Sequence, residues 1–161
     1  GLRLFTVYGP WGRPEMSPSL FARAILEGEP SDVFNHGAMP WEFTFIDDVV
    51  EAALRLLDRP AAPDPGFDAA RPGPATSYAP YRIYNIGNHR PVRLTDYIAE
   101  IEKITGKQAI RVPQPRQAGD MVSTYADTTE LQAAVAFTPD TPLATGVALF
   151  IAWFKDYYGF A

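Results

Sequence analysis

The spacing of apolar and polar residues along the chain predicts a mixed α/β protein. Apolar, β-prone stretches predict strands at Leu2–Tyr8 and Pro80–Asn88, and both strands are expected to be buried on two faces. A shorter strand is expected at Ser31–Gly37, and another begins at Trp41. Because helical segments separate these strands, the expected fold class is α/β.

Apolar residues spaced by three and four positions predict the first two helices. The stretch Pro18–Gly28 has proline at its start, glycine at its end, and Leu20 and Ala24 on its apolar face. The second helix begins near Asp47, since the pattern after Trp41 changes there from alternating to helical. Its predicted apolar stripe comprises Ile46, Val49, Val50, Ala53, Leu54 and Leu57.

The second half of the chain predicts three more helices and one irregular stretch. Leu94–Gly106 is a clearly marked helix with Thr95 expected at the N-cap and glycine at its end. A short helix is expected around Asp127–Val135, and an amphipathic one in the last part of Phe137–Gly159. Arg111–Asp127 contains prolines and shows no period, so it is expected to be irregular.

The length of 161 residues indicates one unit, residues 1–161, with a proline-rich excursion inside it. Residues 60–80 contain six of the 16 prolines, and no hydrophobic period survives there. The strand Pro80–Asn88 resumes directly afterwards, so the excursion does not mark a domain boundary. The abrupt start on an apolar strand suggests that the chain is part of a longer protein.

Charge and composition exclude several partners. A net charge of -5 argues against nucleic acid or an anionic membrane, although one local arginine suffices to bind an anionic small molecule. The sequence has no cysteine and no apolar run of the roughly 20 residues that span a bilayer. A cytoplasmic location is expected.

The usual catalytic motifs are missing from the sequence. No glycine-rich dinucleotide loop joins a strand to a helix, and no tyrosine is followed four positions later by lysine. With two histidines and no cysteine, a metal cluster or a Cys/His nucleophile pair is not expected, and no G-x-S-x-G elbow is present. We therefore assign no catalytic residue and no metal ligand.

An ordered set of segments resembles a known family. LRLFTVYGPWGRPEM, ILEGEP, VFNHG, FTFIDDVVEA, APYRIYNIGN and QAGDMVSTYADTTEL follow one another as in the C-terminal half of the NAD-dependent epimerases and dehydratases, which are extended short-chain dehydrogenases. The set is most similar to the UDP-glucuronate 4-epimerases. The resemblance implies the late strands of a Rossmann-like sheet plus a small α/β substrate-binding lobe.

The resemblance also implies that the catalytic base and the substrate-binding residues lie in different parts of the full-length protein. In the family the glycine loop and the tyrosine-lysine pair lie upstream of the strand with which this chain begins, so the catalytic base and most of the NAD site would lie there. The implied reaction is a transient oxidation at sugar C4, rotation of the 4-keto sugar and return of the hydride. By itself the chain is expected to be inactive, and the full-length protein is expected to be a homodimer.

Site residues follow from the same resemblance, and each has a structural alternative. The resemblance places Phe5 and Thr6 against the cofactor, Thr6 also against the sugar, and Arg13 at the carboxylate of the glucuronate. A guanidinium fork suits that carboxylate, and ligands bind where α/β strands end. Alternatively, Arg13 is a solvated arginine stacked on Trp11, and Thr6 is an ordinary strand residue.

The remaining predicted contacts involve the nucleotide. By resemblance, Val33 and Phe34 hold the uracil, although a Val-Phe pair on a strand is commonly core. Asp120 matches an acid that binds the ribose, with Gln117 three residues before it as in the glucuronate epimerases, and its alternative is a turn acid. The partner that the resemblance implies is a small-molecule UDP-sugar, and a 4,6-dehydratase or a UDP-glucuronate decarboxylase shares the same scaffold.

One stretch departs from the family pattern. Trp41 stands where the family has an arginine that grips the diphosphate, and Glu42 follows it where the family has aspartate. Tryptophan cannot neutralise a phosphate, and Glu42 is expected to repel one. Either another cation covers the charge, with Arg116 as the candidate, or this chain binds UDP-sugars weakly or not at all. The alternative function is a non-catalytic or degenerate nucleotide-sugar-binding or interaction module.

Overall fold

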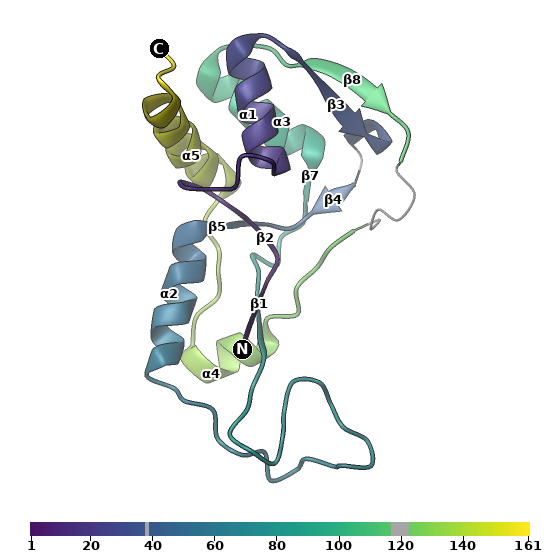
Figure 1. The fold of residues 1–161 in the computed structure, drawn as a ribbon, viewed down its shortest axis with the longest axis vertical. Coiled ribbons are helices and arrows are strands. Elements are labelled where there is room, and N and C mark those ends of the chain that lie inside the picture. The colour runs from purple at the N-terminus through teal and green to yellow at the C-terminus, as the bar shows by residue number, and fades with distance from the viewer. Residues whose placement is uncertain (38, 117–122) are drawn as a thin grey trace.

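The computed structural model describes residues 1–37, 39–116 and 123–161, which form an elongated molecule (Figure 1). The strands are β1 Leu2–Leu4, β2 Thr6–Tyr8, β3 Pro30–Phe34, β4 Pro40–Trp41, β5 Phe43–Phe45, β6 Tyr84–Ile86, β7 Val92–Arg93 and β8 Ile110–Gln114. The helices are α1 Ser17–Glu27, α2 Ile46–Leu57, α3 Leu94–Thr105, α4 Thr129–Val135 and α5 Leu143–Tyr158, with a 3-10 turn at Asn35–Gly37. The mixed α/β prediction is confirmed.

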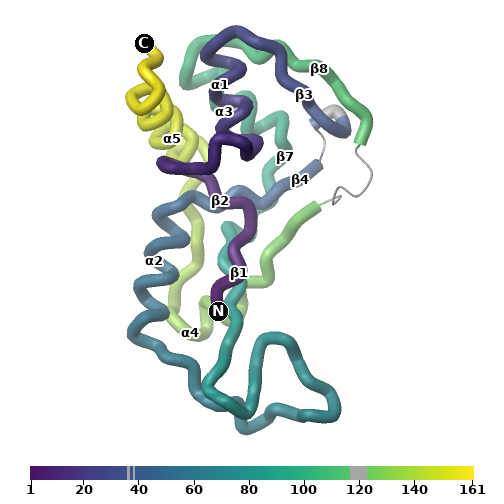
Figure 2. The backbone as a smooth tube through the Cα atoms, in the orientation of Figure 1, coloured from purple at the N-terminus to yellow at the C-terminus, as the bar shows by residue number. Residues whose placement is uncertain are grey.

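The helices divide between the two ends of the molecule. Helices α1, α3 and α5 gather at one end with β3 and β8, while α2 and α4 lie toward the other (Figure 1). The tube view shows the proline-rich residues 60–80 as a long loop that projects beyond α2 and α4 (Figure 2). No helix in the described ranges is both long and apolar enough to cross a membrane.

Parallel pairing dominates the strands. β1 pairs with β6, β2 with β5 and β3 with β8, all parallel, whereas β4 and β7 are antiparallel. Strand β8 contradicts the irregular stretch expected at Arg111–Asp127. Its hydrogen bonds go to β3, where Pro30 is opposite Ile110, so the pairing that creates this strand is remote in sequence.

The strand predicted at Leu2–Tyr8 is present as β1 and β2, but its burial on two faces is wrong. Leu2 and Leu4 are 44% and 50% exposed. Each of β1 and β2 has one strand neighbour in the described chain, so the opposite edge is open. The strand predicted at Pro80–Asn88 is likewise shorter, and only its end from Ile86 onward is buried.

Helix α1 matches its prediction in extent but not in orientation. Gly28 ends it in the left-handed conformation, with φ 74°, as a glycine C-cap allows. The buried face is formed by Phe21, Ala22, Ile25 and Leu26 rather than by Leu20, which is 51% exposed. The reason is that α1 packs against α3 and β3, and Leu20 turns into a hollow beside β3.

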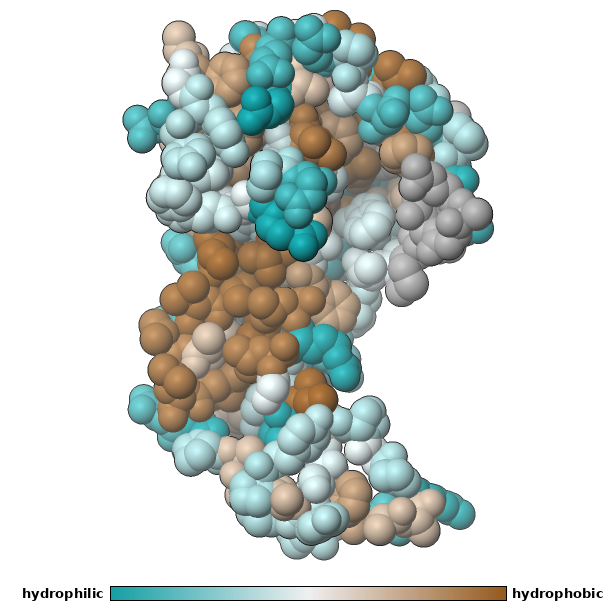
Figure 3. All heavy atoms as spheres, in the orientation of Figure 1, coloured by the Kyte–Doolittle hydropathy of each residue, from teal (hydrophilic) through white to brown (hydrophobic). Residues whose placement is uncertain are grey.

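Helix α2 leaves most of its predicted stripe uncovered. Val49 and Ala52 are buried, while the apolar residues on the other side of the helix are largely exposed. Together with the exposed leucines of β1 they form what we call the apolar face, which consists of Leu2, Leu4, Val50, Leu54 and Leu57. Figure 3 shows a broad hydrophobic surface over this part of the molecule.

Helix α3 begins one residue earlier than its predicted cap. Its N-cap is Arg93 and its first residue is Leu94, so the prediction of Thr95 as N-cap is wrong. The strand β7 runs directly into the helix, which places the turn before Thr95. Gly106 ends α3 in the left-handed conformation, as predicted.

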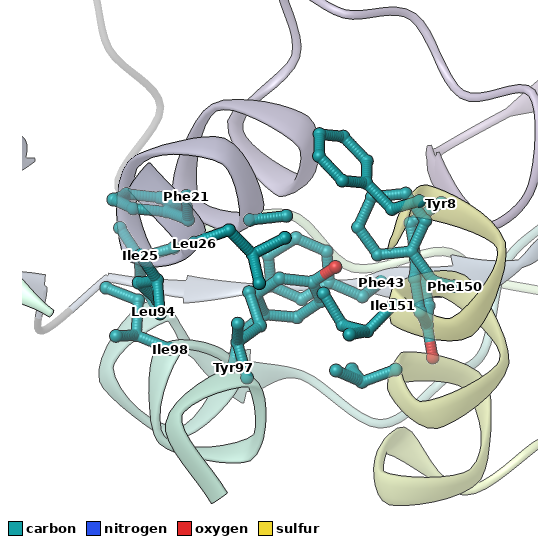
Figure 4. Packing of buried hydrophobic residues seen from close by; sticks show 14 of the residues in the cluster. Tyr8, Phe21, Ile25, Leu26, Phe43, Leu94, Tyr97, Ile98, Phe150 and Ile151 are labelled. Atoms are coloured by element: carbon teal, nitrogen blue, oxygen red, sulfur yellow. The ribbon is translucent and has the colours of Figure 1, made fainter. Parts of the chain in front are cut away.

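The main core lies between α1, α3, α5 and the strands β2 and β5. Figure 4 shows aromatic and aliphatic side chains from these elements converging, with Phe43 and Tyr97 between the helices and Tyr8 against α5. The rings of Phe43 and Tyr97 stack with centroids 4.5 Å apart, and Tyr8 meets Tyr97 edge-on at 5.6 Å. Tyr97 is completely buried, and its hydroxyl has no hydrogen-bond partner among the described residues.

These two tyrosines predict a loss of stability at alkaline pH. Burial, and for Tyr8 also the charge of Asp48, raises the pKa of both phenols above their ordinary value of 10.0. The unfolded chain releases these protons near pH 10.0, whereas the folded chain retains them. The free energy of unfolding is therefore at its full value below that pH and falls as the pH rises above it. One pH unit above this value, each tyrosine should lower the free energy of unfolding by about 1.4 kcal/mol.

Urea unfolding at about pH 8 and about pH 11 measures this loss. Tyr97→Phe removes one titrating group and one unpaired hydroxyl, so it should leave stability at neutral pH unchanged or slightly higher. The variant should also lose about half of the alkaline effect. A variant with the same alkaline loss as the unsubstituted chain would contradict the assignment.

Candidate functional site

The loop that follows β2 encloses a hollow of about 410 Å³. Phe5, Thr6 and Arg13 all line it, together with Met16 and Ile46. The structure therefore brings together three of the residues selected from the sequence: Phe5 just before β2, Thr6 at its start and Arg13 in the loop after it. We call this space the first hollow. It extends along β2 into the loop at the carboxyl end of that strand, where α/β sheets place ligands.

Arg13 is available to a ligand in this hollow. Its Nη2 donates to Met16 Sδ at 2.9 Å, its Nε lies 3.3 Å from Glu15 Oε1, and the side chain is 70% exposed. An exposed pair of this kind contributes little stability, so a substrate carboxylate could take the place of Glu15. The sequence also allowed Arg13 to stack on Trp11. In the structure the Trp11 ring packs instead against Trp153 and Tyr157.

A second hollow, of about 600 Å³, lies between α1, β3 and β4. Phe34 and Trp41 line it with Leu20 and Met39, so its walls are largely apolar. The predicted pair on β3 thus divides: Phe34 borders the second hollow, whereas Val33 is buried in the core at 3% exposure. An aromatic and aliphatic wall of this size suits a planar ring.

The charges around the second hollow are mostly negative. Glu27, Glu29 and Asp32 line it, and Arg23 is the cation among its described lining residues. Arg23 bonds Glu27 at 3.3 Å and lies over the ring of Tyr158, 4.7 Å from its centroid. The sequence reasoning missed Arg23, although its spacing of four from Glu27 was a signal that it lies on the exposed side of α1.

Both hollows reach the start of α1. Met16 lines the first hollow and the adjoining Ser17 lines the second. Within the described ranges no group of three potential metal-ligating side chains is close enough to hold an ion.

Glu42 corrects one expectation from the sequence. It is completely buried, and its carboxylate accepts hydrogen bonds from the backbone N–H groups of His89, at 3.2 Å, and Ala126. It therefore faces the interior and cannot repel a phosphate in either hollow. Its own backbone N–H donates to Thr124 Oγ1 at 3.3 Å, so Glu42 joins β4 to two remote segments.

The residues expected at the diphosphate and the ribose do not form a site in the described part of the structure. Trp41 is half-buried, packs against the core and lines the second hollow, so no positive charge stands at this position. Arg116, the candidate replacement, is exposed after β8 and is not among the described residues that line either hollow. Gln117 and Asp120 lie outside the described residues.

Residues 1–87 match the NAD dependent epimerase/dehydratase family, and the chain belongs to that family. It is similar to Protein CapI of Staphylococcus aureus, with 46% identity over 98% of this chain and 47% of that protein. It is also similar to UDP-glucuronate 4-epimerase 5 of Arabidopsis thaliana, with 39% identity over 98% of this chain and 36% of that protein. The chain thus spans less than half the length of these relatives.

Solved structures agree with the fold. The UDP-glucuronic acid 4-epimerase of Bacillus cereus, in complex with UDP-glucuronic acid and NAD, has a TM-score of 0.79 at 26% identity, covering 98% of this chain and 45% of that one. MoeE5, also in complex with UDP-glucuronic acid and NAD, has a TM-score of 0.77 at 30% identity, covering 97% and 46%. The predicted family, the Rossmann-like fold class and NAD as the family's cofactor are confirmed.

Proposed function

We propose that this chain is the substrate-binding part of a nucleotide-sugar epimerase that interconverts UDP-glucuronate and UDP-galacturonate. The observation that carries the proposal is the first hollow, where Arg13 stands beside Thr6 and Phe5. One relative and one solved structure, both named as UDP-glucuronate 4-epimerases, support the choice of sugar. Phe34 in the second hollow would face the uracil, Trp41 on the same hollow would lie next to the diphosphate, and Arg13 would face the carboxylate.

NAD, when bound, would supply the oxidation at sugar C4. The chain's residues fit only one end of that cofactor, because Phe5 and Thr6 line the first hollow but no glycine-rich loop is present for a pyrophosphate. Binding and orienting the sugar is therefore the task we assign to this chain. The base and the phosphate loop would come from residues outside it.

The apolar face supports the proposal that a further α/β half of the protein packs against this chain. It exposes five large apolar side chains, and Leu4 among them also lines the first hollow. A packed α/β half would bury this face and extend the open edge of β1 and β2. It would also supply the missing wall of the first hollow. A homodimer of the complete protein belongs to the same proposal.

Co-expression tests the proposal directly. The chain is combined with the N-terminal half of the UDP-glucuronic acid 4-epimerase of Bacillus cereus, of which this chain covers 45%, and UDP-glucuronate is added with NAD. We expect UDP-galacturonate, identified by ion-exchange chromatography. Release of carbon dioxide or formation of a 4-keto-6-deoxy sugar would instead indicate a decarboxylase or a dehydratase on the same scaffold. No product would favour a non-catalytic nucleotide-sugar-binding module.

Trp41 is the observation that favours this second candidate, and its replacement tests it. Trp41→Arg should tighten UDP binding about tenfold, because a guanidinium at the second hollow adds a charge-assisted bond to phosphate. Isothermal titration with UDP measures the change. Trp41→Met is the matched control, since it removes the ring without adding charge. Unchanged affinity in the arginine variant would mean that the diphosphate charge is already met elsewhere.

A further inference from the structure

We infer that Trp11 is a positioning residue that holds Arg13 at the first hollow by packing on helix α5. Arg13 lies at the junction of two consecutive turns. The N–H of Gly12 donates to the carbonyl of Gly9 at 3.1 Å, and the N–H of Met16 donates to the carbonyl of Arg13 at 3.2 Å. The direction of the Arg13 side chain therefore depends on how the first turn is held.

Trp11 occupies an unfavourable backbone position in that first turn. Its φ is 65°, in the left-handed region, and Pro10 precedes it. A turn with proline second and a left-handed residue third has the pattern of type II, which favours glycine at the third position. A large side chain is present there at a conformational cost, which implies that the side chain has a use.

The use is visible in the contacts of the ring. The Trp11 ring lies 5.6 Å from that of Trp153 and 5.2 Å from that of Tyr157, both on α5. Helix α5 is itself fixed in the core through Phe150 and Phe154, which are 0% and 1% exposed. The otherwise exposed loop is thus tied to a fixed element one residue away from Gly12 and two from Arg13.

This inference rests on the proposed function for the ligand, a uronate carboxylate at Arg13. If Trp11 positions the guanidinium, its loss should weaken recognition of the carboxylate and spare the rest of the nucleotide sugar. A residue that only stabilised the fold would weaken all ligands equally. The ratio of the affinities for UDP-glucuronate and UDP-glucose therefore separates the two roles.

The experiment compares Trp11→Ala, Trp11→Gly and Trp11→Phe by isothermal titration with both nucleotide sugars. We expect the preference for UDP-glucuronate to fall about tenfold in the alanine and glycine variants and to be kept by phenylalanine. Glycine relieves the strained φ but removes the ring. A glycine variant with the original preference would therefore overturn the inference, because the turn alone would then suffice.

Hydrogen exchange tests the positioning without any ligand. The Met16 amide, which donates to Arg13, should exchange at least about tenfold faster in both the alanine and glycine variants than in the unsubstituted chain. Unchanged exchange in both variants would overturn the inference. If the unsubstituted chain shows no preference for UDP-glucuronate, the proposed function fails at Arg13, and the exchange rates alone decide the role of Trp11.

Discussion

Replacing Gly87 with alanine should destabilise the protein by about 3 kcal/mol or more. A Cβ at this position would lie 1.8 Å from Glu42 Oε1 and 2.6 Å from the Cβ of Ala126. The carboxylate of Glu42 would have to move, and the buried N–H groups of His89 and Ala126 would lose their acceptor. Urea unfolding at neutral pH measures the loss.

Gly73→Ala is the matched control for this substitution. A Cβ at Gly73 meets no atom within 4 Å, so the same chemical change should alter the stability by no more than about 0.5 kcal/mol. Glu42→Gln should also destabilise, because an amide offers one acceptor oxygen where the carboxylate offers two. Equal unfolding midpoints for the two alanine variants would show that the Glu42 carboxylate is not confined as described.

Arg13→Ala should weaken UDP-glucuronate binding by about 10- to 100-fold, the value of a hydrogen-bonded charge pair. Binding of UDP, which lacks the sugar acid, should be unchanged, because Arg13 lines the first hollow and not the second. In the complete enzyme the same substitution should reduce turnover of UDP-glucuronate more than it reduces NAD binding. Titration of the chain and product formation by the complete enzyme measure the two effects.

Arg13→Lys separates charge from geometry. Lysine keeps the positive charge but not the planar fork, so it should recover only part of the affinity. The result that contradicts the assignment is an equal loss for UDP-glucuronate and UDP-glucose in the alanine variant, since the carboxylate is the group that distinguishes these two ligands. No loss for either would mean that Arg13 remains in solvent.

Local signals predicted the fold well where neighbours in sequence decide the structure. The glycines at 28 and 106 end helices as expected, because a left-handed C-cap needs only the residues around it. Strand β8 was not predictable, since its hydrogen bonds go to β3, whose partner residue Pro30 lies far from Ile110 along the chain. The burial of α2 was predicted incorrectly because its apolar stripe is wider than the surface of this chain that packs against the helix.

The site was predictable in part for the same reason. Phe5, Thr6 and Arg13 line one hollow because it extends along β2 and the loop directly after it, and sequence order reveals that these residues are close neighbours. The burial of Glu42 gave no such signal, because an acid is ordinarily exposed. The N–H groups that donate to its carboxylate come from segments remote in sequence. The division of Val33 from Phe34 follows from strand alternation, which puts adjacent side chains on opposite faces.

The three tryptophans give the protein an internal optical reporter for its two hollows. Trp11 and Trp153 are in contact beside the loop that bears Arg13, whereas Trp41 stands alone in the second hollow. A base that enters the second hollow would quench the emission of Trp41 and leave the coupled pair unchanged. Movement of the Arg13 loop would do the reverse. The fluorescence of the unlabelled chain can therefore resolve which end of a nucleotide sugar binds first.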